Sequence, residues 1–71
     1  GSFVIEFRTR LRAVRMEKKK TQKETAEALG MQLRSYQFYE QGAAEPNIAK
    51  LIALADFFDV TLDYLMGRTE Q

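Results

Sequence analysis

The chain has 71 residues, no cysteine, no histidine and a net charge of only +1 at pH 7. A chain of this length is one small domain or a fragment of a longer protein, and a domain of this size buries roughly 60% of its unfolded surface, so we expect modest stability. The missing residue types exclude disulfides, thiolate zinc sites and histidine-based acid–base catalysis within these residues.

The small net charge conceals an uneven distribution along the chain. Residues 1–42 hold nine Lys and Arg against five Asp and Glu, a charge of +4, whereas residues 43–71 hold two against five, a charge of −3. Such asymmetry is expected when one half of a domain meets phosphate. A solvated surface of mixed charge gives the same pattern, so both interpretations stay open at this point.

Nothing in the sequence predicts a membrane segment. The apolar run from Ile52 to Ala55 is interrupted by Asp56, far short of the ~20 residues that span a bilayer. No signal peptide is recognisable. The absence of cysteine suits a reducing cytoplasm, where we expect the protein to work.

The first predicted helix is amphipathic. Residues 1–5 are expected to be an expression scar followed by an apolar lead-in, and the helix should run from about Glu6 to Lys18 or Lys19. Three lysines at its end should interact favourably with the negative C-terminal end of the helix dipole. Its apolar stripe consists of Phe7, Leu11 and Val14, with the stem of Lys18 extending it.

The stretch from Thr21 to Gly42 predicts two short helices joined by a tight turn, at about residues 22–29 and 33–41. Thr21 and Glu24 have the spacing of a capping box, in which each side chain accepts a hydrogen bond from the other residue's backbone N–H. Gly30 can adopt the left-handed conformation that ends a helix. The first of these helices carries a small residue, Ala26, which allows the second to cross close by.

The second helix of this pair should present two different faces. Tyr36 and Tyr39, three residues apart, are expected to face the first helix of the pair, at about residues 22–29, and the core behind it. The opposite, outward face should then carry Leu33, Arg34, Gln37 and Phe38.

Two further helices complete the prediction. Asn47 should cap a helix that ends at about Phe58, and Thr61 should cap a short helix that ends at Gly67, followed by a frayed tail at residues 68–71. Residues 6–67 are therefore expected to form an all-α bundle of five short helices around one core. The apolar positions of the fourth helix, at helical spacing, are Ile48, Leu51, Ile52, Ala55 and Phe58.

A helix, a glycine turn and a second helix with a polar outer face form the geometry that lays a helix in the DNA major groove. The sequence contains an ordered set of residues: Thr21-Gln22, Ala26, Leu29-Gly30, Tyr39-Glu40 and Gly42, followed by Pro46 and LIALADFFDVTLDYLMG. This set resembles the lambda-repressor-like family of phage repressor and Cro-type helix-turn-helix proteins, and the resemblance covers roughly residues 7–67. The resemblance implies sequence-specific binding of double-stranded DNA by a bacterial or phage transcriptional regulator, with repression as the expected mode. It implies no enzymatic activity and no cofactor or metal.

The resemblance also implies roles for individual residues. The outer face of the third helix should contact bases, since arginine can bind guanine O6 and N7, glutamine adenine N6 and N7, and an apolar side chain the thymine methyl. The expected base-contacting residues are Gln32, Leu33, Arg34, Gln37 and Phe38. Phosphate contacts are expected from Gln22, which in relatives also braces the third helix, from Lys23, and from the chain around Asn47. Arg15 and Glu40 occupy positions that form a structural ion pair in relatives.

Three positions depart from the family pattern. Relatives usually place Ser or Thr, as the cap of the third helix, where this chain has Gln32. The loop at residues 43–45 is often basic in relatives and reads Ala-Ala-Glu here, so we expect no phosphate contacts from its side chains. Relatives often have glycine where Lys19 stands, and lysine is strained in a left-handed conformation, so the connection after the first helix could differ.

Two functions remain open on the sequence. The first is DNA binding as a homodimer on a roughly palindromic site, because one recognition helix contacts too few base pairs for a genome. Candidate residues for the dimer contact are Phe57, Tyr64 and Met66. The alternative is a protein-interaction module that keeps the helix-turn-helix fold and binds a partner protein through Leu33, Tyr36 and Phe38. An enzyme is the least supported function, and no small-molecule site is evident.

Overall fold

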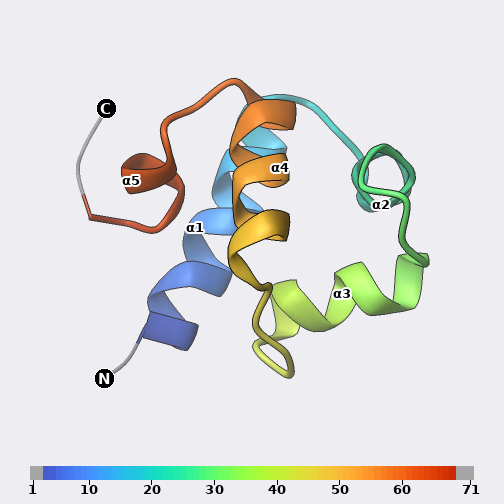
Figure 1. The fold of residues 1–71 in the computed structure, drawn as a ribbon, viewed down its shortest axis with the longest axis horizontal. Helices are drawn as coiled ribbons and strands as arrows, with labels where there is room; N and C mark the ends of the chain where they lie inside the picture. Colours follow the sequence, from blue (N-terminus) through green and yellow to red (C-terminus); the bar gives the residue numbers. More distant parts are fainter. Residues whose placement is uncertain (1–2, 69–71) are drawn as a thin grey trace.

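The computed structural model describes residues 3–68, which form five α-helices and no strand (Figure 1). This arrangement confirms the predicted all-α fold. The predicted expression scar at residues 1–2 and residues 69–71 of the predicted frayed tail lie outside the described residues. The helices are α1 (Phe3–Glu17), α2 (Gln22–Ala28), α3 (Leu33–Gln41), α4 (Ile48–Phe58) and α5 (Leu62–Leu65).

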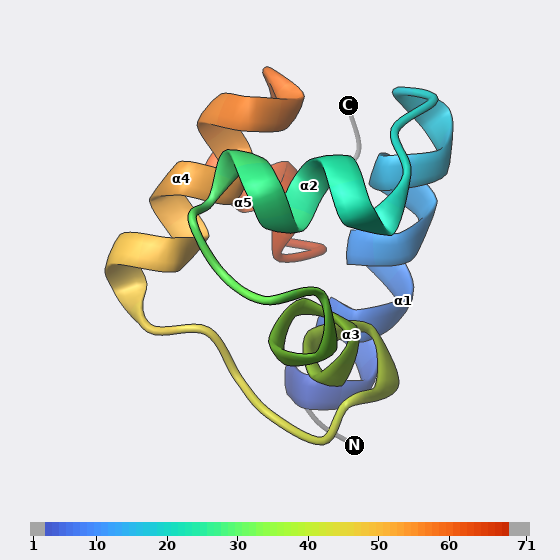
Figure 2. The same cartoon turned by 90° about the vertical axis from the view of Figure 1, so that its right-hand side faces the viewer.

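The helix pair α2 and α3 lies on one side of the molecule. The two helices pack against each other, and α3 also packs against α1 while α2 contacts α4. Helix α5 closes the other side by packing on α1 and α4. Viewed from the side of the helix pair, α2 crosses in front and α3 is seen almost along its axis below it, with α4 and α1 on either side (Figure 2).

Local hydrogen bonds explain why α2 begins and ends where it does. The Thr21 hydroxyl accepts from the Glu24 amide at 2.9 Å, and the Glu24 carboxylate accepts from the Thr21 amide at 2.8 Å, which confirms the capping box. After α2, Gly30 has φ +69°, and the Met31 amide donates to the Ala26 carbonyl at 3.0 Å. This Schellman motif turns the chain sharply toward α3.

A lysine makes the corresponding turn after α1. Lys19 has φ +59°, and the amides of Lys19 and Lys20 donate to the carbonyls of Met16 and Arg15 at 3.0 and 3.1 Å. The chain therefore follows the usual left-handed path without glycine, and the connection is not rerouted. A non-glycine residue in this conformation costs roughly 1–2 kcal/mol.

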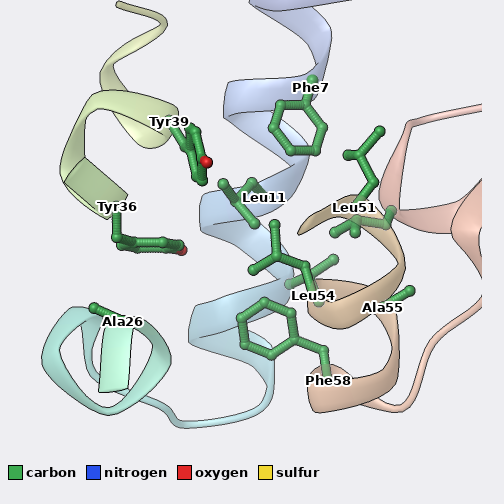
Figure 3. Packing of buried hydrophobic residues seen from close by; sticks show 11 residues of the cluster. Phe7, Leu11, Ala26, Tyr36, Tyr39, Leu51, Leu54, Ala55 and Phe58 are labelled. Carbon is green, nitrogen blue, oxygen red and sulfur yellow. The ribbon is translucent and has the colours of Figure 1, made fainter. Parts of the chain in front are cut away.

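Side chains from α1, α2, α3, α4 and α5 meet in one core (Figure 3). Phe7, Leu11 and Val14 of α1 are buried, as the predicted stripe requires. Tyr36 and Tyr39 of α3 are buried as well and make an edge-to-face contact, with ring centroids 6.2 Å apart. Figure 3 shows both tyrosines directed from α3 toward Leu11. The predicted inward face of α3 is thus confirmed.

Two details of the prediction were wrong. Helix α1 begins at Phe3, three residues before Glu6, because residues 3–5 contain neither glycine nor proline to stop it. In α4, Ile48 and Ile52 are 64% and 48% exposed, whereas Leu54 is fully buried. The buried stripe of α4 therefore includes Leu54 in place of Ile48 and Ile52. It comprises Leu51, Leu54, Ala55 and Phe58.

Candidate nucleic-acid interface

Helix α3 turns the predicted base-contacting residues away from the core. Gln32, the N-cap, makes no capping hydrogen bond with its side chain and is exposed, as are Leu33 and Arg34. Gln37 and Phe38 are half-buried. The structure therefore collects all five on the surface of one helix, and their contacts with bases stay a prediction.

Phe38 is less exposed than the sequence suggested because Arg34 covers it. The guanidinium carbon of Arg34 lies 5.5 Å from the centroid of the Phe38 ring. A cation over an aromatic face is attracted by the ring quadrupole, by about 0.5–1 kcal/mol at exposed sites. This contact holds the cation of Arg34 on the outer face of α3.

The inner side of α3 is fastened to α1 by the expected ion pair. Arg15 Nε donates to Glu40 Oε2 at 2.6 Å and Arg15 Nη2 donates to Glu40 Oε1 at 3.2 Å, with side-chain exposures of 13% and 5%. Arg15 Nη1 also donates to the Lys20 carbonyl at 2.9 Å. One guanidinium therefore ties together α1, the turn before α2, and the end of α3.

Four hydrogen bonds saturate the Glu40 carboxylate. Besides the two from Arg15, it accepts one from the Tyr36 hydroxyl and one from Gln22 Nε2 at 3.0 Å. Burial alone raises the pKa of Glu40, but these donors and the charge of Arg15 outweigh burial and hold the pKa below its usual value. Burial and the bond to Glu40 raise the pKa of Tyr36, so its hydroxyl remains a donor.

Two glutamines extend this network to the outer face of α3. Gln22 Nε2 donates to Glu40 Oε1 at 3.0 Å, and Gln37 Nε2 donates to Gln22 Oε1, also at 3.0 Å. Gln22 stands at the start of α2, and Gln37 is one of the predicted base-contacting residues. Hydrogen-bonded side chains thus join the buried ion pair to the outer face of α3. We call Glu40, Gln22 and Gln37 the amide chain.

The predicted phosphate-contacting residues lie at two helix starts. Gln22 and Lys23 occupy the first turn of α2, and Lys23 is exposed. Asn47 is exposed and caps α4, with Oδ1 accepting from the Lys50 amide at 2.9 Å, so its side-chain nitrogen carries the remaining donors. Glu24 shares the first turn of α2, and backbone and side-chain hydrogen bonds with Thr21 lower its pKa, so a negative charge lies close to Lys23.

Part of the positive charge of the first half is engaged in contacts within the fold. The Arg10 guanidinium lies 4.6 Å from the ring centroid of Tyr64 in α5, and the Lys20 ammonium lies 5.6 Å from that of Phe57 in α4. Arg15 is committed to its ion pair. These three basic side chains are therefore engaged by other parts of the fold.

A structural contact of Lys50 was among those that sequence reasoning missed. Lys50 Nζ donates at 3.1 Å to the carbonyl of Leu29, the C-cap residue of α2, which fastens α4 to the turn before α3. A cation at a helix C-terminus also complements the helix dipole. The available signal was that Lys50 is the only charged residue between Ile48 and Ala55.

Within residues 3–68, no group of three or more carboxylates is placed to hold a metal ion. In the same part of the chain, each helix is too short or too polar to cross a lipid bilayer.

Known proteins share this arrangement. The helix-turn-helix family model matches residues 11–65, which include all of α2, α3, α4 and α5. The chain is 40% identical over 62 residues to the HTH-type transcriptional regulator AnsR of Bacillus subtilis, covering 87% of this chain and 53% of that protein. It is 34% identical over 64 residues to the cryptic phage CTXphi transcriptional repressor RstR of Vibrio cholerae, covering 90% and 57%.

A solved structure agrees with these relatives. The crystal structure of a transcriptional regulator from Listeria innocua superposes with a TM-score of 0.80 at 32% identity, over 92% of this chain and 61% of that one. The present chain spans about half the length of the curated relatives it matches. The family match over residues 11–65, together with the capped helix pair braced by Arg15 and Glu40, shows that this chain belongs to the lambda-repressor-like helix-turn-helix family.

Proposed function

We propose that this chain is the DNA-binding domain of a transcriptional regulator and that α3 enters the major groove of double-stranded DNA. The observation that supports this most is the division of α3. Its inner face is locked into the core by Tyr36, Tyr39 and the Glu40 ion pair, while its outer face presents polar and cationic groups. A rigid helix with an outer face of this kind can hold side chains in register with base edges.

Contacts are divided between two groups of side chains in this proposal. Residues of the outer face of α3 contact bases, with Arg34 suited to guanine O6 and N7. Gln22, Lys23 and Asn47 contact phosphates, which position the domain without selecting sequence. Gln22 Nε2 uses one of its two N–H groups on Glu40, so the second is available to a phosphate.

A binding assay on duplexes selected from a random pool tests the proposal. We expect an enriched motif, and we expect binding to that motif to weaken steeply with salt, with a log–log slope of roughly −0.9 per neutralised phosphate. A pool that yields no motif after repeated selection, with folded protein, would contradict the proposal.

We further propose that the working species is a homodimer that acts as a repressor on a palindromic operator in the cytoplasm. The name of the Vibrio phage relative supports repression. The dimer is supported by the small number of base pairs that one α3 can contact, and half-sites should lie about one helical turn, ~34–36 Å, apart. Among the candidate contact residues, Phe57 and Tyr64 are half-buried and pack against the core, so a partner could reach only part of each.

The alternative is a protein-interaction module, and one of the three residues expected to contact its partner is not accessible. Tyr36 is fully buried, because it packs in the core and bonds to Glu40, so it cannot contact a partner protein. Leu33 remains exposed and Phe38 is half-buried beneath Arg34. A protein partner bound through these two apolar groups would show little salt dependence, which separates this alternative from DNA binding.

A further inference from the structure

Resting on the proposed function, we infer that the amide chain fixes which way the side-chain amide of Gln37 faces, and that Gln37 therefore selects adenine at its base position. The structure supplies the necessary contacts. Glu40, Gln22 and Gln37 are joined by two hydrogen bonds of 3.0 Å each, and both glutamines are half-buried. Ionised Glu40 sets the direction of the first link, and in the second link the structure places the Gln22 oxygen, which can only accept, against the Gln37 nitrogen.

The direction is set by the carboxylate at the inner end. Ionised Glu40 can only accept hydrogen bonds, so Gln22 must turn its nitrogen toward Glu40. The Gln22 oxygen then faces Gln37, and that oxygen can only accept. Gln37 must therefore turn its own nitrogen toward Gln22. In an ordinary exposed glutamine the two ends of the amide exchange freely, whereas here a buried negative charge determines the orientation of both amides.

This orientation leaves Gln37 with defined hydrogen-bonding capacity toward a ligand. Its nitrogen donates one N–H to Gln22 and has a second N–H free, and both lone pairs of its oxygen are free to accept. The oxygen and nitrogen lie on opposite sides of the amide carbon, so turning the nitrogen to α2 turns the oxygen away from α2. An acceptor with one adjacent donor remains for a base.

Only some bases complement that pattern in the major groove. Adenine presents a donor at N6 beside an acceptor at N7, which matches both remaining groups of Gln37, and cytosine presents a donor at N4. Guanine and thymine present hydrogen-bond acceptors alone, so they could accept from the remaining Gln37 N–H but would leave the Gln37 oxygen facing an acceptor instead of a donor. We therefore expect adenine, which satisfies both groups, to be preferred over cytosine, guanine and thymine, each of which satisfies only one.

Nuclear magnetic resonance of the free domain tests the orientation without DNA. In Gln22→Met, which keeps the length but removes both polar atoms, the side-chain amide signal of Gln37 should move to that of exposed Gln41 in the same spectrum. The matched change Lys23→Met, one residue along α2, should leave the Gln37 signal in place. An unmoved Gln37 signal in folded Gln22→Met would overturn the inference. Gln22→Ala provides the same comparison if the methionine variant does not fold.

Selection from random duplexes then tests the base preference. The position contacted by Gln37 is the one whose preference disappears in Gln37→Ala. There the parent should prefer adenine over guanine by roughly five- to 150-fold, the range typical of a bidentate contact. In Gln22→Met, guanine and thymine should become tolerated at that position alone, while Lys23→Met should weaken all duplexes alike.

Three results of the selection would overturn the inference. These are a parental preference for guanine or thymine at the Gln37 position, an unchanged preference in Gln22→Met, and a motif that Gln37→Ala leaves intact. A parent that selects no motif would instead overturn the proposed function, and the base preference with it. The resonance experiment would then still decide whether the amide chain orients Gln37.

Discussion

Replacing Arg15 by alanine should destabilise this domain far more than an average surface substitution. Arg15 and Glu40 are 13% and 5% exposed, and removing one partner of a largely buried pair costs about 3–5 kcal/mol because the other charge stays buried without compensation. A 71-residue domain has roughly 4–11 kcal/mol of stability, at ~0.05–0.15 kcal/mol per residue. The variant should therefore lose a large part of the total free energy of unfolding.

The loss should depend on pH in a defined direction. In the parent, burial raises the pKa of Glu40, but hydrogen bonds from Arg15, Tyr36 and Gln22 lower it below 4.5 overall. The stability that ionised Glu40 contributes is thus complete above pH 4.5 and is lost as the pH falls through the folded-state pKa. Without Arg15, burial is less compensated and the pKa of Glu40 should rise. Protonation of Glu40 then removes the uncompensated buried charge from the variant. The difference in the free energy of unfolding between variant and parent should therefore shrink in acid.

Urea denaturation followed by circular dichroism, at neutral pH and at about pH 4, measures both effects. Arg12→Ala is the matched control, because Arg12 is exposed on the same helix and should change stability by no more than about 0.5 kcal/mol. If Arg15→Ala is as stable as this control, or if its deficit grows in acid, the described role of the ion pair is wrong.

Four further substitutions test separate parts of the structure. Leu51→Ala should cost about 2–5 kcal/mol and neighbouring Ile52→Ala far less, since they are 5% and 48% exposed; equal melting temperatures would contradict the core assignment. Lys19→Gly should raise the melting temperature by several degrees, because glycine removes roughly 1 kcal/mol of left-handed strain; a lower melting temperature would refute this reasoning. Lys23→Ala should weaken all duplexes alike and flatten the salt slope by about one unit, and an unchanged slope would remove Lys23 from the phosphate contacts.

The helix pair could be predicted because its signals are local. The capping box at Thr21 and Glu24, the left-handed Gly30 and the spacing of Tyr36 and Tyr39 each act within a few residues, and the structure confirms all of them. The ion pair between Arg15 and Glu40 spans 25 residues, and its expectation came from the family resemblance rather than from any local pattern.

Features that depend on how helices face one another were harder to predict. In α4 almost every position is apolar, so periodicity alone could not tell that Leu54 turns inward and Ile52 outward. The bond between Gln22 and Gln37 joins two side chains 15 residues apart. The resemblance implied that Gln22 braces the third helix, but nothing in the sequence showed that Gln37 is the residue it contacts. Their coupling depends on the crossing of α2 and α3, which brings Gln37 to Gln22 and Gln22 to Glu40.

The central claim, that the outer face of α3 contacts bases, is tested most directly by selecting sites from random duplexes for the parent and for folded Arg34→Ala in parallel. The parent should enrich a motif with two symmetric halves. The variant should bind the parental motif about 1–3 kcal/mol more weakly and lose preference at one base position in each half, leaving the other positions unchanged. If Arg34→Ala enriches the parental motif with every preference intact, and Gln37→Ala does the same, α3 does not contact the bases and the account is contradicted.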